Sequence, residues 1–284
     1  MSIEIDFYTD WIEMAKKHLN LLGVTLQTSV DKDSIPFIYF NCKKRIIPKF
    51  RRRILKSDVF RCPPELSDGL TYLENKIVNG EDLTPHLSKL VLKKYDSRDY
   101  MLNDWGIYHL HLGKTIEADG FVTRTGPVLY CRVDQSCVYF IHIKDHGNWS
   151  EQELLRIVYR NWKDTLEPHI VKGALGTENH PTNDEIKALR KANVNTLLEI
   201  DNGVVLAPPG GGYATDGTSM EVVLSRDNLI KYLEDFESQI KKNEDEIRKQ
   251  IQTKTIPASQ LQFKLEYRSN RFVAYEVYSK MFFA

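Results

Sequence analysis

Four histidines lie close together in this sequence, although its 284 residues contain only eight. His109 and His111 are two positions apart in "DWGIYHLHLG", and His142 and His146 follow in "YFIHIKDHGNW". Both segments are rich in β-forming residues, so we expect a strand in each. Side chains two positions apart in a strand share a face. If the two strands belong to one sheet, the four imidazoles converge.

Three uses of such a cluster remain open. The first is a metal site, in which His109, His111, His142 and His146 hold zinc or another divalent metal in a hydrolase, although the sequence has no HExxH motif. The second is cleavage of RNA without a cofactor: one imidazole takes the proton of the 2′-hydroxyl and another protonates the leaving oxygen. The third is a structural role, in a module that binds nucleic acid or protein without catalysis.

Cationic and hydroxyl side chains between the two histidine segments complete the acid–base hypothesis. Arg124 lies in "VTRTGPVLY", and Tyr130 and Arg132 share one face of the next expected strand. A guanidinium stabilises the charge that develops on a phosphate during cleavage. The predicted catalytic residues are therefore His109, His111, Arg124, Tyr130, Arg132, His142 and His146.

A basic segment, "NCKKRIIPKFRRR", stands out because the chain as a whole is neutral, with 39 basic and 39 acidic residues. Phosphate backbone is the natural partner of such a patch, and the aromatic residues nearby offer stacking surface for single-stranded nucleic acid. The alternative is a surface patch whose charges pair with acids elsewhere in the fold. The predicted RNA-binding residues are Lys43, Lys44, Arg45, Lys49, Arg51, Arg52 and Arg53.

Two further motifs are weak. Gly212, Gly217, Thr218 and Ser219 have the spacing of a Walker A loop, but Thr218 replaces the lysine. We expect the following "EVVL" to be a strand where that motif requires a helix, so we reject nucleotide binding here. The Gly210–Ser219 loop is also a candidate hinge over a site.

The second weak motif is Asp134 with His142 and Lys144. It resembles the D…(D/E)xK arrangement of restriction-like nucleases, but histidine replaces a magnesium-binding carboxylate.

The order of expected elements predicts an α+β fold, with an antiparallel sheet of hairpins flanked by helices. We expect three stretches: residues 1–98 with the basic segment, the histidine-rich core 99–175, and residues 176–284. The expected strands are 36–41, 106–112, 128–133, 138–143, a hairpin turning at Asn202-Gly203, 261–267 and 271–278. The expected helices are one from Thr9 or Asp10 to Gly23, one ending near Val78, one opened by Thr84-Pro85, one capped by Ser150 and Glu153, one capped by Thr182 and Glu185, and a long one at 227–251.

The long helix has apolar residues at nearly heptad spacing, namely Leu229, Leu233, Phe236, Ile240, Ile247 and Ile251. A dimeric coiled coil and a helix packed on its own sheet both fit this pattern. We favour packing on the sheet because the pattern covers only about three and a half heptads.

Composition gives a location but no partner. The zero net charge favours neither nucleic acid nor membrane, and no apolar run is long enough to cross a bilayer. The N-terminal "MSIEIDFYTDW" lacks the order of a signal peptide. The four cysteines, Cys42, Cys62, Cys131 and Cys137, form no CxxC pair. We therefore expect a cytoplasmic protein with reduced thiols and no membrane partner.

The segment "RTGPVLYCRVDQSCVYFIHIKDHGNW" resembles the central hairpin of RelE/ParE-type bacterial toxins. In these toxins an arginine-bearing strand turns back into a strand that ends in a polar or histidine-rich tip. Tyr130, Arg132, Tyr139, His142 and His146 occupy the matching positions. The resemblance implies a small α+β fold, metal-free RNA cleavage in the RelE branch, and an antitoxin partner.

The resemblance covers only residues 104–162, and the chain is about three times as long as such toxins. The family's opening helical hairpin is not visible before the sheet, and His109 and His111 have no counterpart. The ParE branch shares the fold but acts on gyrase. We therefore expect a toxin-like or phage-defence protein that cuts or grips RNA, and the resemblance leaves its activity and oligomeric state open.

Overall fold

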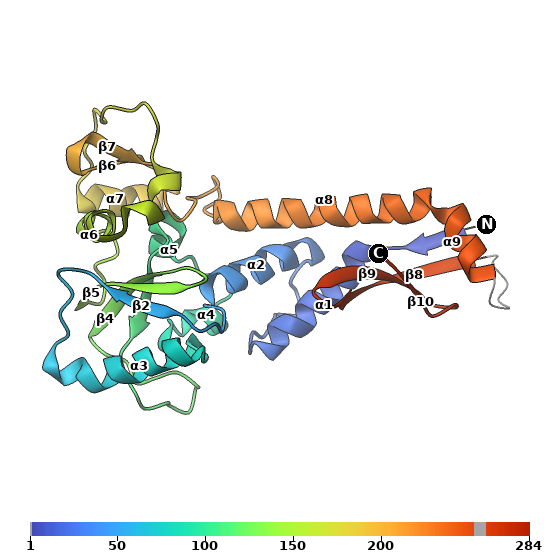
Figure 1. Ribbon diagram of the computed structural model, residues 1–284, viewed down its shortest axis with the longest axis horizontal. Helices are drawn as coiled ribbons and strands as arrows, with labels where there is room; N and C mark the ends of the chain where they lie inside the picture. The colour runs from blue at the N-terminus through green and yellow to red at the C-terminus, as the bar shows by residue number, and fades with distance from the viewer. Residues whose placement is uncertain (1, 253–259) are drawn as a thin grey trace. The chain divides into compact units, whose positions relative to one another are not determined.

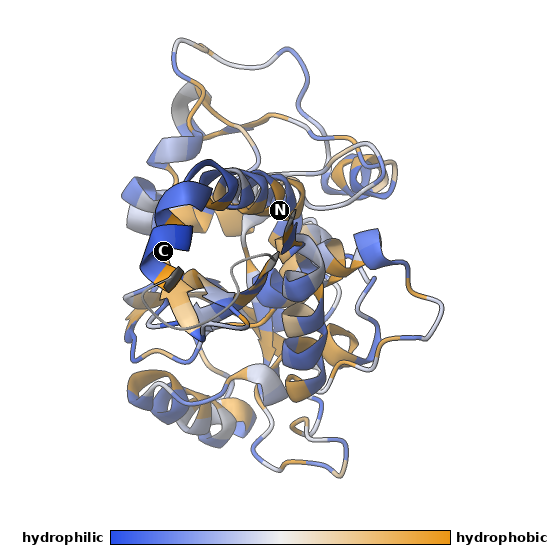
Figure 2. Ribbon diagram, turned by 90° about the vertical axis from the view of Figure 1, so that its right-hand side faces the viewer, coloured by the Kyte–Doolittle hydropathy of each residue, from blue (hydrophilic) through white to orange (hydrophobic). Residues whose placement is uncertain are grey.

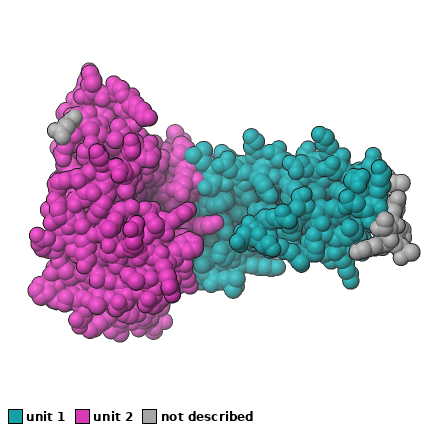
Figure 3. Space-filling view, viewed as in Figure 1, with its two compact units in different colours: residues 1–40, 224–284 teal, residues 41–223 magenta. Residues whose placement is uncertain are grey.

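The computed structural model describes residues 2–252 and 260–284, which form an α+β fold as expected. The chain divides into two compact units (Figure 3): unit 1 comprises residues 1–40 and 224–284, and unit 2 comprises residues 41–223. This division differs from the three consecutive stretches expected. Strand β1 (Ser2–Ile5) pairs in parallel with β8 (Gln260–Arg268), which joins the two ends of the chain in one sheet.

Unit 1 is built on a four-stranded sheet in the order β1-β8-β9-β10, with β9 at Arg271–Glu276 and β10 at Met281–Phe283. Its helices are α1 (Phe7–Leu21), the start of α2 (Ile35–Arg45), most of α8 (Met220–Lys242), and α9 (Glu244–Gln252). The expected long helix is thus two helices that break at Asn243. Their apolar residues share one core with Phe263 and Leu265 of the sheet, which confirms packing on the chain's own sheet. Figure 2 shows that helices of the protein carry both hydrophilic residues, in blue, and hydrophobic residues, in orange.

Unit 2 is built on a second four-stranded sheet in the order β2-β5-β4-β3 (Figure 1). Strand β4 (Pro127–Val133) pairs antiparallel with both β3 (Tyr108–His111) and β5 (Cys137–Asp145), and β2 (Arg53–Lys56) runs parallel to β5. The prediction that both histidine strands lie in one sheet is therefore confirmed. The turn after β4 forms because the Asp134 carboxylate accepts the N–H groups of Ser136 and Cys137, at 2.7 and 2.6 Å.

The two faces of this second sheet bury different partners. Leu110, Leu129 and Phe140 pack in one core with α3 (Ser67–Asn79). Val128, Tyr130 and Ile141 on the opposite face pack in another core with α5 (Tyr100–Trp105) and α6 (Glu153–Trp162). His109 and His111 alternate with Leu110 along β3, so they lie on the side of α5 and α6.

The remaining elements of unit 2 are α4 (Leu90–Lys93), α7 (Asn183–Lys191) and the hairpin of β6 (Leu198–Ile200) and β7 (Val204–Leu206). The expected capping box is confirmed at α7, where Thr182 and Glu185 bond each other's backbone N–H groups. Short 3-10 turns lie at Lys32–Ser34, Pro64–Leu66, Thr84–His86, Lys163–Thr165, Glu167–His169 and Asp201–Gly203. Within residues 2–252 and 260–284, no helix is both long and apolar enough to span a membrane.

Two expected strands are wrong. Residues 36–41 belong to helix α2, where buried Ile35, Ile38, Cys42 and Arg45 recur every three or four positions. The "EVVL" segment is the first turn of α8, so a short apolar run was misread as a strand.

Two expected helix starts are also wrong. Ser150 and Glu153 form no capping box, because α6 begins at Glu153 itself and Ser150 is buried. Thr84-Pro85 opens one 3-10 turn rather than an α-helix.

Candidate active site

The second sheet brings three of the four histidines together. Strand β3 supplies His109 and His111, and the turn after β5 supplies His146. The backbone N–H of His146 donates to the Gly126 carbonyl at 3.1 Å. The ring centroids lie 6.3 Å apart for His109–His111, 5.9 Å for His109–His146 and 5.6 Å for His111–His146. We call these three residues the histidine cluster.

The pairing register of β3, β4 and β5 explains why these three histidines lie together. His111 stands opposite Val128 on one side of β4, and Lys144 stands opposite Val128 on the other side. The end of β3 and the end of β5 therefore reach the same edge of the sheet. Gly147, at φ 112°, lets the chain turn sharply there.

Trp149 closes one side of the cluster. Its ring centroid lies 4.5 Å from that of His109 and 4.7 Å from that of His146. It also lies 5.7 Å from the ring of Tyr130, which is fully buried beneath it. The indole thus joins the exposed imidazole of His146 to the core and limits access of water to His109.

All three imidazoles are held in the neutral form. Burial lowers the pKa of His111 to about 3, and the Arg124 charge and the neighbouring histidines add to this effect. Burial also lowers the pKa of His109, with His146 and Arg124 contributing, and it lowers the pKa of His146, with Arg124 contributing. A neutral imidazole can accept a proton, so near pH 7 the cluster contains bases.

Several nitrogens around the cluster have no partner. The Nδ1 atoms of His109 and His111 and the Nη2 of Arg124 are buried without a hydrogen bond in the part of the chain that the structure describes. The other end of the Arg124 guanidinium is fixed, since Nη1 donates to the Leu87 carbonyl at 2.8 Å. Leaving a buried polar atom unpaired costs about 1–3 kcal/mol, so these atoms point to a ligand with acceptor and donor atoms.

The geometry gives the metal hypothesis no support. Among residues 2–252 and 260–284, no group of three or more histidine, cysteine, aspartate or glutamate side chains is arranged to hold a metal ion. The restriction-like motif is also dispersed. Asp134 accepts the N–H groups of its own turn, and Lys144 pairs with Glu151.

His142 does not join the cluster. It stands opposite Tyr130 on the side of β4 away from β3, so one strand separates it from His109. Its Nδ1 lies 2.8 Å from the Ile143 carbonyl, and no ring contact with the other histidines occurs among the described residues. The predicted convergence of four imidazoles therefore reduces to three.

The remaining predicted catalytic residues also separate. Arg132 is placed toward His169 and Tyr139: burial lowers the pKa of His169 and the Arg132 charge adds to this effect, and Tyr139 stands opposite Arg132 across β4 and β5. Burial lowers the pKa of Arg132 to about 10. Tyr130 is a core residue whose hydroxyl donates to the Asp145 carbonyl at 3.2 Å, and burial raises its pKa. Arg124 is thus the predicted arginine that lies beside the histidines.

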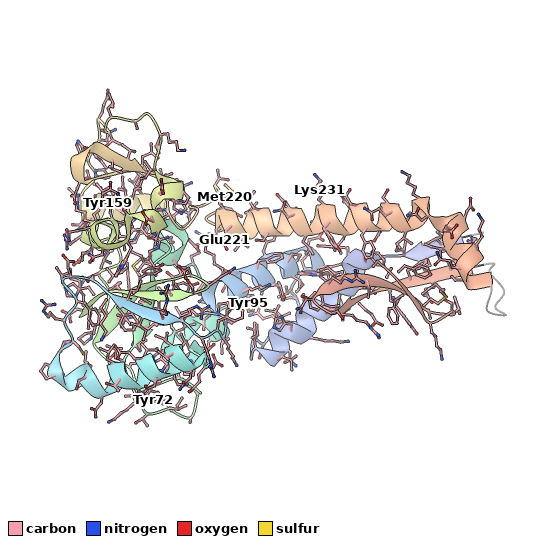
Figure 4. The ribbon with its side chains drawn as sticks, in the orientation of Figure 1. Tyr72, Tyr95, Tyr159, Met220, Glu221 and Lys231 are labelled. Atoms are coloured by element: carbon pink, nitrogen blue, oxygen red, sulfur yellow. The ribbon has the colours of Figure 1, made fainter. Side chains whose placement is uncertain are left out.

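The structure divides the basic segment into structural and exposed residues. Lys44 donates to the Gly210 carbonyl at 2.8 Å and pairs with Glu221, near the start of α8 (Figure 4), at 2.8 Å. Arg45 is buried and donates to the Lys94 carbonyl at 3.3 Å, and buried Arg52 donates to the Asp134 carbonyl at 2.6 Å. The predicted RNA-binding residues with exposed side chains are Lys43, Lys49, Arg51 and Arg53.

The glycine-rich loop is followed by helix α8, so one of the two reasons for rejecting a Walker A site, the expected strand, is wrong, whereas the other, Thr218 in place of the lysine, holds. Its backbone nevertheless has internal partners. Gly210 N–H donates to the Asp104 carbonyl at 2.7 Å, and Gly212 N–H donates to the Asn103 carbonyl at 2.8 Å. Because these N–H groups are bonded to α5, they are not available to cradle phosphate, and the loop is anchored rather than hinged.

Sequence reasoning missed two parts of this region. Trp149 lies only three residues beyond His146, so its place beside the cluster had a signal in the sequence. The buried ion pair of Asp104 and Arg190, with Nε to Oδ2 at 2.7 Å, had none, because 86 residues separate the partners. Comparisons with protein-family models, with curated proteins and with solved structures find no match to this chain.

Proposed function

We propose that this protein is an endoribonuclease of a toxin-like or phage-defence kind, which cuts RNA by acid–base chemistry at the histidine cluster. One observation carries the proposal. Three neutral imidazoles meet at one sheet edge within reach of the Arg124 charge, and nitrogens on His109, His111 and Arg124 have no partner within the described residues. A phosphodiester supplies acceptors for these groups.

The reaction needs two proton transfers and stabilisation of charge. One imidazole takes the proton of a 2′-hydroxyl while that oxygen bonds to phosphorus. The bond from phosphorus to the 5′-oxygen breaks, and a second imidazole protonates that oxygen. Arg124 stabilises the negative charge that gathers on the phosphate during the step. The products are a 2′,3′-cyclic phosphate and a 5′-hydroxyl.

The lowered pKa values keep the imidazoles neutral, as a base must be before it accepts a proton, but they also weaken that base and leave the acid to be explained. Without substrate, burial and Arg124 disfavour protonation of His109, His111 and His146. A bound phosphate brings negative charge next to the rings and thereby opposes both effects. The substrate itself therefore raises the pKa of one imidazole and lets it serve as the acid.

Two further features support RNA as the substrate. The β4–β5 hairpin ends in the histidine-bearing turn that the resemblance to RelE-type toxins leads us to expect. The exposed Lys43, Lys49, Arg51 and Arg53 remain candidates for contact with the phosphate backbone. An antitoxin partner would follow from the same resemblance.

Cleavage of a single-stranded RNA oligonucleotide tests the proposal. His146→Ala should lower the rate at least roughly a hundredfold, because it removes an exposed proton-transfer group without opening the core. His142→Ala is the matched control and should retain most of the rate, since His142 lies outside the cluster. A chelator should leave the rate unchanged, and a DNA oligonucleotide should stay intact because it lacks the 2′-hydroxyl.

The proposal fails if the wild-type protein leaves all RNA intact over a broad range of pH and salt. It also fails if His146→Ala and His142→Ala lower the rate equally, or if the products carry a 3′-hydroxyl and a 5′-phosphate.

A further inference from the structure

A small pocket opens beside the histidine cluster: Trp149 lines it and also contacts His109 and His146 of the cluster. The pocket has a volume of about 130 Å³. Tyr100 and Trp149 form its aromatic walls, and helix α7 contributes Lys187, Arg190 and Lys191. Every residue of the pocket lies in unit 2.

Arg190 is built into the wall of this pocket. Its side chain is 3% exposed, Nε donates to Asp104 Oδ2 at 2.7 Å, and Nη1 donates to the Trp149 carbonyl. Its guanidinium carbon lies 4.0 Å from the centroid of the Trp105 ring. Nη2 is buried and has no partner in residues 2–252 and 260–284. The guanidinium is thus rigidly held, and its unpaired Nη2 lies within the wall rather than at the surface of the pocket.

The mouth of the pocket is cationic. Lys187 and Lys191 are exposed and lie four residues apart, on one side of α7. Within the described part of the chain neither makes an ion pair, so their charges attract an anionic ligand.

The size of the pocket limits what enters it. Pockets for drug-sized ligands have volumes of roughly 300–1,000 Å³, so this one admits a single ring system rather than a longer chain. Aromatic walls favour a planar ring, on which they can stack. A ring that carries phosphate at its edge matches both the walls and the cationic mouth.

We propose that the pocket binds a nucleobase of the RNA, next to the phosphate that the histidine cluster holds. The base stacks against Tyr100 and Trp149, Arg190 holds the backbone of Trp149 in place, and Lys187 and Lys191 contact a neighbouring phosphate. That the bound base belongs to RNA rests on the proposed function. Binding of a free nucleotide in the pocket does not require that the protein cleaves RNA. Cleavage should then depend on the base beside the cut.

Isothermal titration of the full chain with mononucleotides tests the pocket directly. AMP and CMP should bind, and ribose 5-phosphate and inorganic phosphate should bind at least tenfold more weakly because they lack the ring. Tyr100→Ala should weaken binding of the better nucleotide roughly five- to a hundredfold through loss of stacking. Equal binding of ribose 5-phosphate and both nucleotides would overturn the base pocket.

A charge reversal tests the mouth with a matched control. Lys187→Glu with Lys191→Glu should weaken nucleotide binding at least tenfold. Lys163→Glu with Lys172→Glu makes the same change in net charge at exposed residues outside the pocket and should leave binding nearly unchanged. Equal losses of nucleotide binding in both double variants would show that net charge, rather than the position of Lys187 and Lys191, causes the effect. This result would overturn the assignment of the cationic mouth.

The two proposals can fail separately. Nucleotide binding without any cleavage of RNA would overturn the nuclease and leave the pocket. Cleavage of RNA without heat of binding at millimolar AMP or CMP, and with no preference for the base at the cut, would overturn the pocket and leave the nuclease.

Discussion

The two four-stranded sheets treat buried polar groups differently. In unit 1, Glu276 of β9 is fully buried, and its carboxylate accepts the N–H groups of Ser279 at 2.6 Å and Gln262 at 3.2 Å. In unit 2, buried nitrogens of His109, His111 and Arg132 have no partner among the described residues, whereas in unit 1 only Arg226 Nε of helix α8, outside the sheet, lacks one among them. A fold that needs only stability satisfies its buried polar atoms, and departures from this rule concentrate at functional sites. The contrast favours unit 2 as the part of the molecule that binds a ligand.

Breaking the buried ion pair of unit 2 should have the largest effect on stability. Arg190→Met leaves Asp104, whose side chain is 4% exposed, without its partner and should cost about 3–5 kcal/mol in the free energy of unfolding. Arg268→Met is the control in unit 1, because its pair with Glu266 is exposed and should cost less than about 1 kcal/mol. Urea denaturation followed by tryptophan fluorescence measures both variants. Similar losses in the two variants would contradict this difference.

Acid should destabilise unit 2 through its buried imidazoles. Burial lowers the pKa of His111 from 6.5 to about 3 and that of His86 to about 4. Between these values and pH 6.5 the unfolded chain binds more protons than the folded one, so stability falls as the pH decreases. Each group should cost roughly 2–3 kcal/mol at pH 4.5 relative to pH 7.

Urea denaturation at several pH values measures this loss, and His111→Asn should flatten the pH dependence. His180→Asn is the control, because that imidazole is exposed and makes one long contact, 3.9 Å from Glu199. A wild-type stability that stays constant from pH 7 to pH 4.5 would show that His111 and His86 are not held neutral.

Replacing Glu276, whose buried carboxylate accepts two N–H groups in unit 1, should have an intermediate effect on stability. Glu276→Met keeps a side chain of similar size but leaves the N–H groups of Gln262 and Ser279 without an acceptor. The expected loss is about 1–3 kcal/mol in the free energy of unfolding, measured by circular dichroism in urea. A neutral substitution would mean that these N–H groups find other partners, and the contrast between the sheets would weaken.

Sequence patterns predicted the parts of the fold that depend on local periodicity. Strands β4 and β5 are short runs of β-forming residues joined by an Asp-bearing turn, so their hairpin could be found without coordinates. The α2 helix could not, because Phe37, Tyr39 and Phe40 are strong β-formers whose helical state is decided by packing in unit 1. The joining of both chain ends in one sheet is a long-range pairing that leaves no local pattern.

The candidate site was predicted in part for the same reason. Alternation along β3 placed His109 and His111 on one face, and their nearness to His146 followed from the sheet. The exclusion of His142 depends on strand order, since β4 lies between it and β3. A sequence gives the face of a strand but not its neighbours, so His142 and Arg132 could not be separated from the cluster in advance.

Replacing Arg132 should have the smallest effect on stability. Its unpaired guanidinium shows the contrast with the satisfied carboxylate of unit 1 most clearly. Its guanidinium is largely buried, Nη1 has no partner within the described residues, and burial lowers its pKa to about 10. Arg132→Met removes this unpaired group and keeps an apolar chain of similar length, so stability should change by less than about 1 kcal/mol or rise. The cleavage rate should stay within about threefold of the wild type, because Arg132 lies toward His169 rather than the cluster.

Arg124→Met, beside the histidines, should instead lower the rate at least roughly a hundredfold. If Arg132→Met abolished cleavage and Arg124→Met did not, the catalytic arginine would be the one that the resemblance to RelE-type toxins indicates, and the site would have to be moved along β4.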